Sequence, residues 1–231
     1  KECIKKLKIM PQTCLMKMNL KRNKTFFSYM KDTYTVNNFF NYGYVKLKLP
    51  KKLYKKLLKE CLNARKNKIK ITGISSEGVP KHFYIEKYHD ELIDFVHSAH
   101  ELYEKHFPNL ADIKILTSNL PYKYGRPWIN LQKQHEFIPC HNHDGIFSYS
   151  IWMQIPYDSS KEKYSGNFHF MYLDTLGFLR TEAHTLSKED EGTLIMFPSK
   201  LNHMVYPYYK NNNTRISISG NIMLDSDGKK K

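Results

Sequence analysis

Alternating polar and apolar residues fill the chain after Pro108, in short runs separated by turn residues. Because neighbouring side chains of a strand point to opposite faces, such runs predict strands with one buried face. The predicted strands lie within residues 113–118, 127–134, 147–156, 166–173, 177–186, 192–198, 203–209 and 214–224. About eight short strands without helices between them predict a β-sandwich or jelly roll.

Helical periodicity appears only before Pro108. Residues 45–49 alternate in the manner of a short strand, and Pro50 stands where a helix is expected to begin. A second helix is predicted over residues 90–106, with Asp90 as its N-cap. The first helix has lysines opposite an apolar stripe of Leu53, Leu57, Leu58, Cys61 and Leu62. The histidines of the second helix are expected on the surface: His97, His100 and His106.

The order of these elements predicts a fold class that is mainly β with α. Two N-terminal helices are expected to pack against a double-stranded β-helix (jelly-roll) core. We expect a single domain over residues 35–231, with an entry and helical part (35–110) before the jelly-roll core (111–224). Residues 1–34 lack hydrophobic periodicity and concentrate charge, so they are expected to form a flexible basic arm.

The net charge of +15 originates in the N-terminal third. Residues 1–70 hold 20 of the 37 Lys and Arg but only 3 of the 22 Asp and Glu. One interpretation is an anionic partner for the arm, such as nucleic acid or an acidic protein. The other is a solvated basic tail and helix face. We favour the second, because the arm has no known nucleic-acid-binding motif and few regularly interleaved aromatic residues.

Neither a membrane span nor a signal peptide is expected. No apolar stretch approaches the ~20 residues of a membrane helix, and lysines interrupt every apolar stretch of the first 24 residues. The four cysteines show no CxxC pair and no framework spacing, which indicates reduced thiols in an intracellular, cytoplasmic protein. No pattern in the sequence indicates an oligomeric state.

Three predicted strands combine a polar face with an apolar face. The polar faces consist of Trp128, Asn130 and Gln132; of Ser148, Ser150, Trp152 and Gln154; and of Arg215, Ser217, Ser219 and Asn221. Polar strand faces often meet solvent, but exposed strands are usually rich in Lys and Glu, whereas Arg215 is the only charge here. We therefore interpret these faces as the lining of a barrel mouth.

The segment HNHDG, residues 141–145, lies between two of these strands. His141 and His143 are two positions apart, so their side chains share a direction at a strand end. His203 begins a later strand and completes the pattern of a three-ligand metal site. A lone histidine is more often structural, and His135, His169 and His184 are interpreted in that way.

The identity of the third ligand leaves an alternative open. Zinc can use three histidines and a water, whereas Fe(II) usually takes two histidines and a carboxylate. His143 occupies the position of that carboxylate. Asp144 would point to the other side of a regular strand, although a bulge could bring it round. His143 is therefore the predicted ligand and Asp144 the alternative.

Arg215 favours an anionic co-substrate beside the metal. It follows His203 by 12 residues, and Ser217 shares its strand face. Such a pair can hold a dicarboxylate through a bidentate arginine contact and a hydroxyl hydrogen bond. A zinc hydrolase does not need such a dicarboxylate-binding pair.

At this point the chain resembles the 2-oxoglutarate/Fe(II)-dependent oxygenase superfamily, from about Asn41 to Leu224. The resemblance rests on LPKKLYKKLLKECL, WIN, HNHDG, SYSIW, GNFHF, GTLIMFPSKLNH and RISISGN. It is closest to oxygenases of marine phages and bacteria that have HxH in place of HxD, so a virus-encoded protein would fit it.

The resemblance implies a dioxygenase of the hydroxylase type that uses Fe(II), 2-oxoglutarate and O₂. It assigns iron binding and catalysis to His141, His143 and His203. It assigns the C5 carboxylate of 2-oxoglutarate to Arg215 and Ser217, and Asn130 is a further candidate for cofactor binding. The implied reaction is hydroxylation, or demethylation through hydroxylation.

Two other functions stay open. A cupin-type dioxygenase would use three histidines without 2-oxoglutarate, and GTLIMFPSKLNH resembles a cupin motif with Lys200 in place of the usual glycine. A metal-free jelly-roll binding module with a basic arm is the third reading. Residues 71–86 and 156–167 are expected to shape substrate entry. A protein side chain, a nucleobase and a small metabolite all remain open as substrates.

Overall fold

The computed structural model describes residues 42–64, 81–107, 120–210 and 212–225. The predicted arm (1–34), the predicted strand at 113–118 and most of the predicted entry loop at 71–86 lie outside these residues. In the described part, no helix is long and apolar enough to cross a bilayer.

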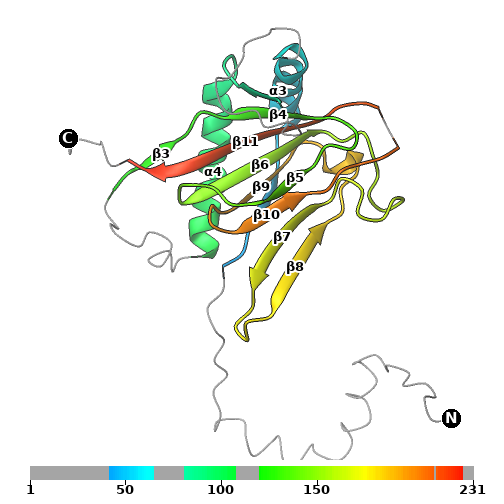
Figure 1. The fold of residues 1–231 in the computed structure, drawn as a ribbon. Coiled ribbons are helices and arrows are strands. Elements are labelled where there is room, and N and C mark those ends of the chain that lie inside the picture. Colours follow the sequence, from blue (N-terminus) through cyan, green and yellow to red (C-terminus); the bar gives the residue numbers. More distant parts are fainter. Residues whose placement is uncertain (1–41, 65–80, 108–119, 211, 226–231) are drawn as a thin grey trace, which may run out of the picture. The chain divides into compact units, whose positions relative to one another are not determined.

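Two antiparallel sheets form the core, as a jelly roll requires (Figure 1). The larger sheet has the order β1 (Val45–Lys48), β9 (Thr193–Pro198), β6 (Phe147–Gln154), β11 (Arg215–Leu224), β4 (Trp128–Gln132) and β2 (Lys81–Tyr84), with β3 (Tyr122–Tyr124) paired to β11. The smaller sheet has the order β5 (Ile138–His141), β10 (Asn202–Val205), β7 (Phe168–Leu173) and β8 (Leu179–His184). A short 3₁₀ helix, η1 (Lys188–Asp190), precedes β9.

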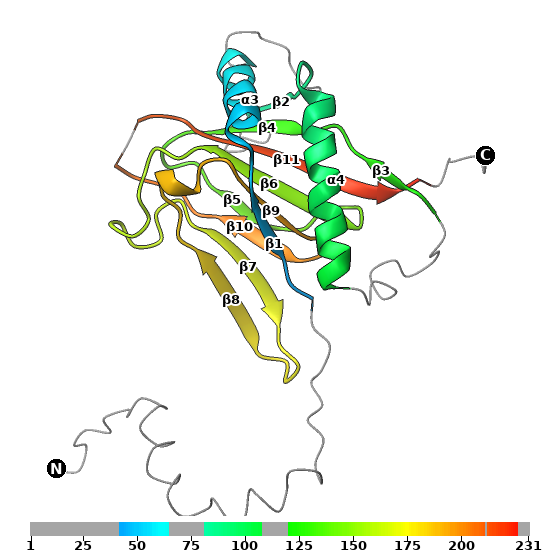
Figure 2. The ribbon, with the colours of Figure 1, turned by 180° about the vertical axis from the view of Figure 1, so that it is seen from behind.

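Two helices cover the outer face of the larger sheet, α3 (Lys51–Ala64) and α4 (His89–His106) (Figure 2). The apolar residues of the central strands point toward them, including Ile129, Ile151 and Ile218, which are fully buried in one cluster with the helices. This burial explains why the helices are amphipathic and why their lysines lie outside. The predicted arrangement of two helices on a β core is confirmed.

The space between the two sheets is apolar in one part and polar in another. Phe168 and Phe170 of β7 pack there against Trp152 and Phe197 of the larger sheet. The remaining inward positions of β4, β6 and β11 carry amides and hydroxyls, most of which are buried. The polar strand faces are therefore largely shielded from solvent, in agreement with their interpretation as a barrel lining.

The start of α4 differs from its prediction. The helix begins at His89, and Asp90 is not its N-cap. The carboxylate of Glu60 on α3 instead accepts the N–H groups of residues 86–88, at 2.7–3.2 Å. A carboxylate from a neighbouring helix thus satisfies backbone donors just before the helix, where the helix dipole also favours negative charge.

The prediction that His100 lies on the surface is wrong. Its exposed fraction is 3 %, and its ring packs against those of Tyr122 and Phe147 at 4.3 and 4.9 Å. The short strand β3 brings Tyr122 onto this side of α4, and the periodicity of the helix alone does not reveal that contact. Strands β2, β3 and β5 were likewise not predicted, because KHFY and IPCH do not alternate between polar and apolar residues and YKY has only three residues.

The alternation of β11 predicts a large energetic difference between its two faces. Ile218→Ala removes a fully buried side chain from the helix-covered face and should lower the free energy of unfolding by about 2–5 kcal/mol. Ser219→Ala, next to it on the partly exposed polar face, should cost much less. Denaturant unfolding of both variants measures this, and equal losses would contradict the assignment of the faces.

Candidate metal centre

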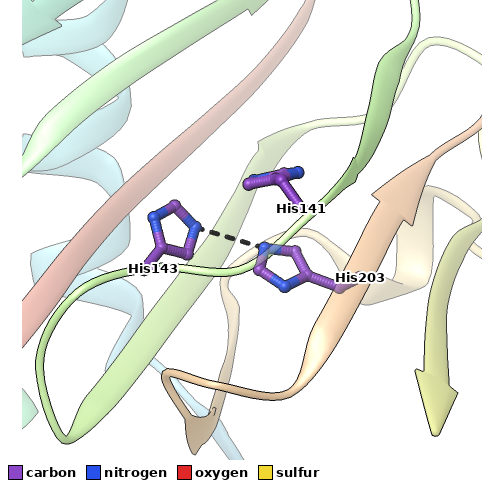
Figure 3. A group of neighbouring side chains, drawn as sticks. All are labelled: His141, His143 and His203. Atoms are coloured by element: carbon purple, nitrogen blue, oxygen red, sulfur yellow. Dashed lines mark hydrogen bonds between the residues drawn. The ribbon is translucent and has the colours of Figure 1, made fainter.

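Three histidines from two neighbouring strands and the turn after one of them meet at one place (Figure 3). His141 ends β5, His143 follows it by two residues, and His203 is the second residue of β10. His203 lies directly opposite His141 in the antiparallel β5–β10 pair. One ligand atom of each histidine lies within 4.8 Å of the other two, and the described part of the chain holds no other such group.

Backbone carbonyls fix the hydrogen positions of two of these rings. His141 Nδ1 lies 2.8 Å from the carbonyl oxygen of Pro139, and His203 Nδ1 lies 3.0 Å from that of Leu201. Because a carbonyl only accepts, each Nδ1 is the donor and each Nε2 keeps its lone pair. His143 Nε2 faces His203 Nε2 at 3.2 Å. The bonds from Nδ1 of His141 and of His203 to backbone carbonyls are of the kind that orients metal-ligating histidines through their second ring nitrogen.

Burial keeps two of the imidazoles neutral. Loss of solvation lowers the pKa of His203 to about 3 and that of His143 to about 4, and repulsion from His141 adds to both shifts. The aromatic rings of Phe168 and Phe197, 5.5 and 4.9 Å from the His203 ring, account for much of its burial. Because their pKa values are this low, both rings are unprotonated at neutral pH. The unprotonated ring is the form that binds a metal.

Asp144 points away from the three histidines. Its side chain is fully exposed, and it accepts a hydrogen bond from Lys200 Nζ at 3.3 Å. His143 occupies the inward position instead, because its backbone N–H donates to the Ser199 carbonyl at 2.9 Å. The register irregularity of the β5–β10 pair lies before His141, between the pairs His203–His141 and Val205–Ile138, and does not bring the carboxylate round. The group of potential ligand atoms contains His143 rather than Asp144.

The turn after His143 is tied to the turn before β10. Gly145 adopts φ +114°, a backbone conformation that favours glycine, and an added Cβ there would lie 2.8 Å from the Ile222 carbonyl. The amide of Ser199 donates to the Ile146 carbonyl at 2.9 Å, and its hydroxyl lies 2.9 Å from that of Ser148. These bonds hold the segments of His143 and His203 at a fixed separation.

Arg215 is a buried cation on the inner face of β11. Its exposed fraction is 2 %. Its Nη1 donates to Gln132 Oε1 at 2.8 Å, and it also hydrogen-bonds Tyr157. Its Nε is buried without a partner, and no salt bridge to it is found among the described residues. An unpaired buried charge is costly, so this environment suits an anion.

Ser217 and Asn130 line the same face. They are directly opposite each other in the β4–β11 pair, and both are buried. Asn130 Nδ2 donates to Ser219 Oγ at 3.0 Å and approaches Ser217 Oγ at 3.5 Å. The structure thus places Arg215, Ser217 and Asn130 on one continuous polar surface.

Three residues that support Arg215 were not assigned a role from the sequence. Gln132 was recognised only as part of a polar face, although it holds the guanidinium. Tyr157 and Tyr208 stack with ring centroids 4.9 Å apart, and the Tyr208 hydroxyl accepts from the Arg215 amide at 3.4 Å. Both tyrosines lie outside the strands of the structure, because the strand predicted over residues 203–209 ends at Val205 and Tyr157 follows the end of β6.

A family model described as "Putative 2OG-Fe(II) oxygenase" matches residues 126–221. The match begins just before β4 and ends within β11, so it includes the three histidines and Arg215. No curated protein matches the chain.

Solved structures of such oxygenases share the fold. A Pseudomonas putida prolyl-4-hydroxylase has a TM-score of 0.54 at 16 % identity, over 80 % of this chain and 95 % of that one. A Trichoplax adhaerens prolyl hydroxylase, solved with a hypoxia-inducible-factor peptide, has 0.53 at 11 %, over 94 % and 95 %. The viral collagen prolyl hydroxylase of Paramecium Bursaria Chlorella virus-1, solved with 2-oxoglutarate, has 0.50 at 12 %, over 79 % and 96 %. The predicted double-stranded β-helix is confirmed.

The positions of His143 and Asp144 predict opposite outcomes for two neighbouring substitutions. His143→Ala removes a ligand atom and should abolish stoichiometric Fe(II) binding, whereas Asp144→Ala should leave the affinity unchanged. Anaerobic titration of both variants with Fe(II), and with Co(II) for its visible absorption, measures this. Loss of metal by the Asp144 variant with retention by the His143 variant would show that the carboxylate is the ligand.

Proposed function

We propose that the chain is a 2-oxoglutarate/Fe(II)-dependent oxygenase, which its family match over residues 126–221 and its fold support, and that both cofactors bind between its two sheets. The proposed iron ligands are His141, His143 and His203. The proposed 2-oxoglutarate-binding residues are Arg215, Ser217 and Asn130. The reaction we propose is the hydroxylation of a substrate C–H bond, with O₂ as the oxidant.

The donor set supports an iron site, although it departs from the usual two histidines and one carboxylate. Three imidazoles offer nitrogen ligands that suit Fe, Zn, Cu and Ni alike. When bound, Fe(II) supplies the oxidising chemistry of the family. The three histidines would hold the ion from β5, the turn after it and β10, and the carbonyls of Pro139 and Leu201 orient two of the rings.

The unpaired Arg215 Nε is the observation that carries the 2-oxoglutarate proposal. The guanidinium is held rigidly by Gln132 and Tyr157, so its free donor has a fixed direction. A carboxylate placed there would satisfy the donor and neutralise the buried charge. Ser217, two residues on and on the same face, would supply a hydroxyl to the same group. A site without an anionic ligand would leave the arginine uncompensated.

Aromatic packing around the metal-binding residues supports an oxidising centre shielded from water. The Phe168 and Phe197 rings contact His203, and the Trp128 ring lies 6.0 Å from that of His143. Trp128 is partly exposed, whereas the two phenylalanines are buried. The substrate therefore has an apolar surface to approach on the Trp128 side.

Arg215→Leu should weaken 2-oxoglutarate binding by roughly 100-fold or more, because it removes a charge-assisted pair worth a few kcal/mol. Fe(II) binding should persist, since Arg215 is not a ligand. Anaerobic titration of the weak visible band of the Fe(II)–2-oxoglutarate complex measures both. Arg126→Leu, which removes an exposed arginine paired with Glu86, is the matched control and should bind as the wild type does.

The same preparation tests the proposed function itself. Succinate formation that depends on Fe(II), 2-oxoglutarate and O₂ supports the oxygenase. Wild-type protein that binds iron without a visible band and without calorimetric 2-oxoglutarate binding would instead favour a cupin-type dioxygenase. A chain that binds no metal after anaerobic reconstitution would leave the jelly-roll binding module. If Arg215→Leu binds 2-oxoglutarate as tightly as the wild type, the arginine is structural.

A further inference from the structure

One edge strand differs from the others in the charges that it carries. Edge strands expose unpaired backbone groups, which proteins often protect with proline or with charged side chains, lysine above all. Of the other edge strands, β1 carries Lys46 and Lys48, β2 carries Lys81, β3 carries Lys123 and β5 carries Pro139. The edge strand β8 has the sequence LRTEAH, with neither residue, and pairs only with β7 among the described strands.

The same β7–β8 hairpin exposes a group of large apolar side chains at its tip. Figure 1 shows this hairpin at the outer end of the smaller sheet, projecting beyond the other strands. The exposed fractions lie between 59 and 78 % for Leu173, Leu176, Phe178 and Leu179. Scattered exposed leucines need no explanation, but a contiguous apolar group often marks an interaction site.

The sequence of β8 is complementary to itself when it runs antiparallel. With Thr181 opposite Thr181 of a second copy, Arg180 lies opposite Glu182, and Leu179 lies opposite Ala183. Directly opposed residues of opposite charge stabilise an antiparallel pair. A two-fold axis uses the same surface on both subunits, so it satisfies both charge pairs at once. We propose that two copies of this chain dimerise through β8, joining their smaller sheets into one.

The two charged residues keep free hydrogen-bonding capacity for a second copy. Arg180 pairs with Asp174 through Nε at 2.7 Å, and its guanidinium lies over the Phe178 ring, 5.6 Å from the centroid, which leaves both terminal NH₂ groups without a hydrogen-bond partner in the described structure. Glu182 Oε1 accepts a hydrogen bond from the Tyr44 hydroxyl, and Oε2 has no partner among the described residues. Each side chain is therefore oriented by its own chain and still offers atoms to the opposite strand.

The apolar tip also gains from this arrangement. Leu179 lies at the proposed β8–β8 contact, where Ala183 of the second copy covers part of its side chain. Its cross-strand neighbour Leu173 lies on the same face of the hairpin. Pairing of β8 with a second β8 therefore satisfies the exposed backbone edge and part of the exposed apolar group together. An unrelated partner would have no reason to match the order of charges along β8.

Charge reversal distinguishes a dimer contact from a purely structural effect, because only a dimer contact is restored when the two reversed variants are mixed. Sedimentation velocity of the full chain should give twice the 27.5 kDa of one chain. In a dimer of the Arg180→Glu variant, residues 180 and 182 that face each other across the two-fold axis would both be acidic. In a dimer of the Glu182→Arg variant they would both be basic. Each variant alone should therefore sediment as a monomer. An equimolar mixture should recover a heterodimer, because opposite charges then face each other.

Lys56→Glu is the matched control, since it reverses an exposed charge paired with Glu91 on the helices, away from β8. It should remain dimeric. Thermal unfolding confirms that each variant folds. A wild-type chain that sediments as a monomer overturns the proposal, as does a dimer that survives both single reversals. Monomeric single variants whose mixture stays monomeric would show that Arg180 and Glu182 do not face each other across a seam.

Discussion

The strict alternation of β4, β6 and β11 is the constraint on which the rest of this structure depends. Because successive side chains of a strand point to opposite faces, the same three strands bury isoleucines under two helices and point amides and hydroxyls inward. A shift of one residue in any pairing would exchange the two faces. The apolar side therefore fixes the register, and the register decides where Arg215 and Asn130 stand.

The three histidines of the proposed metal site depend on a different pairing, that of β5 with β10. His141 and His203 are opposite each other in that pair, so two rings converge without help from a loop. The third ring comes from the turn after β5, which is tied by its backbone to the turn before β10. The three proposed ligands thus rest on main-chain hydrogen bonds in two adjacent segments. Because the main chain of these two segments positions all three rings, a motif as short as HNH together with one distant histidine suffices to specify the proposed site.

Polar groups between the two sheets differ in whether their hydrogen bonds are satisfied within the protein. Around Ser148, Ser199 and Asn221 the hydroxyls and the amide bond to one another, so that part of the interior is satisfied as it stands. Around Arg215 the interior is not satisfied, because a buried guanidinium nitrogen lacks an acceptor. The contrast distinguishes a polar network that stabilises the fold from a buried charge whose surroundings support the proposed anion site. It also explains why a single arginine carries more information about function than the many serines near it.

The sequence by itself determined most of the longer strands, the two helices, the polar strand faces and the candidate group of His141, His143 and His203. Each of these follows from a period of two or 3.6 residues or from the place of a residue at a predicted strand end, which are local properties. It did not determine the order of the strands, the strands β2, β3 and β5, the burial of His100, or the support of Arg215 by Gln132, Tyr157 and Tyr208. Strands β2 and β5 do not alternate between polar and apolar residues and β3 has only three residues, and the partners of a buried side chain come from segments far away in the chain. Only the tertiary structure decided that Asp144 points outward, because a hydrogen bond from the distant Ser199 fixes the turn in which it lies.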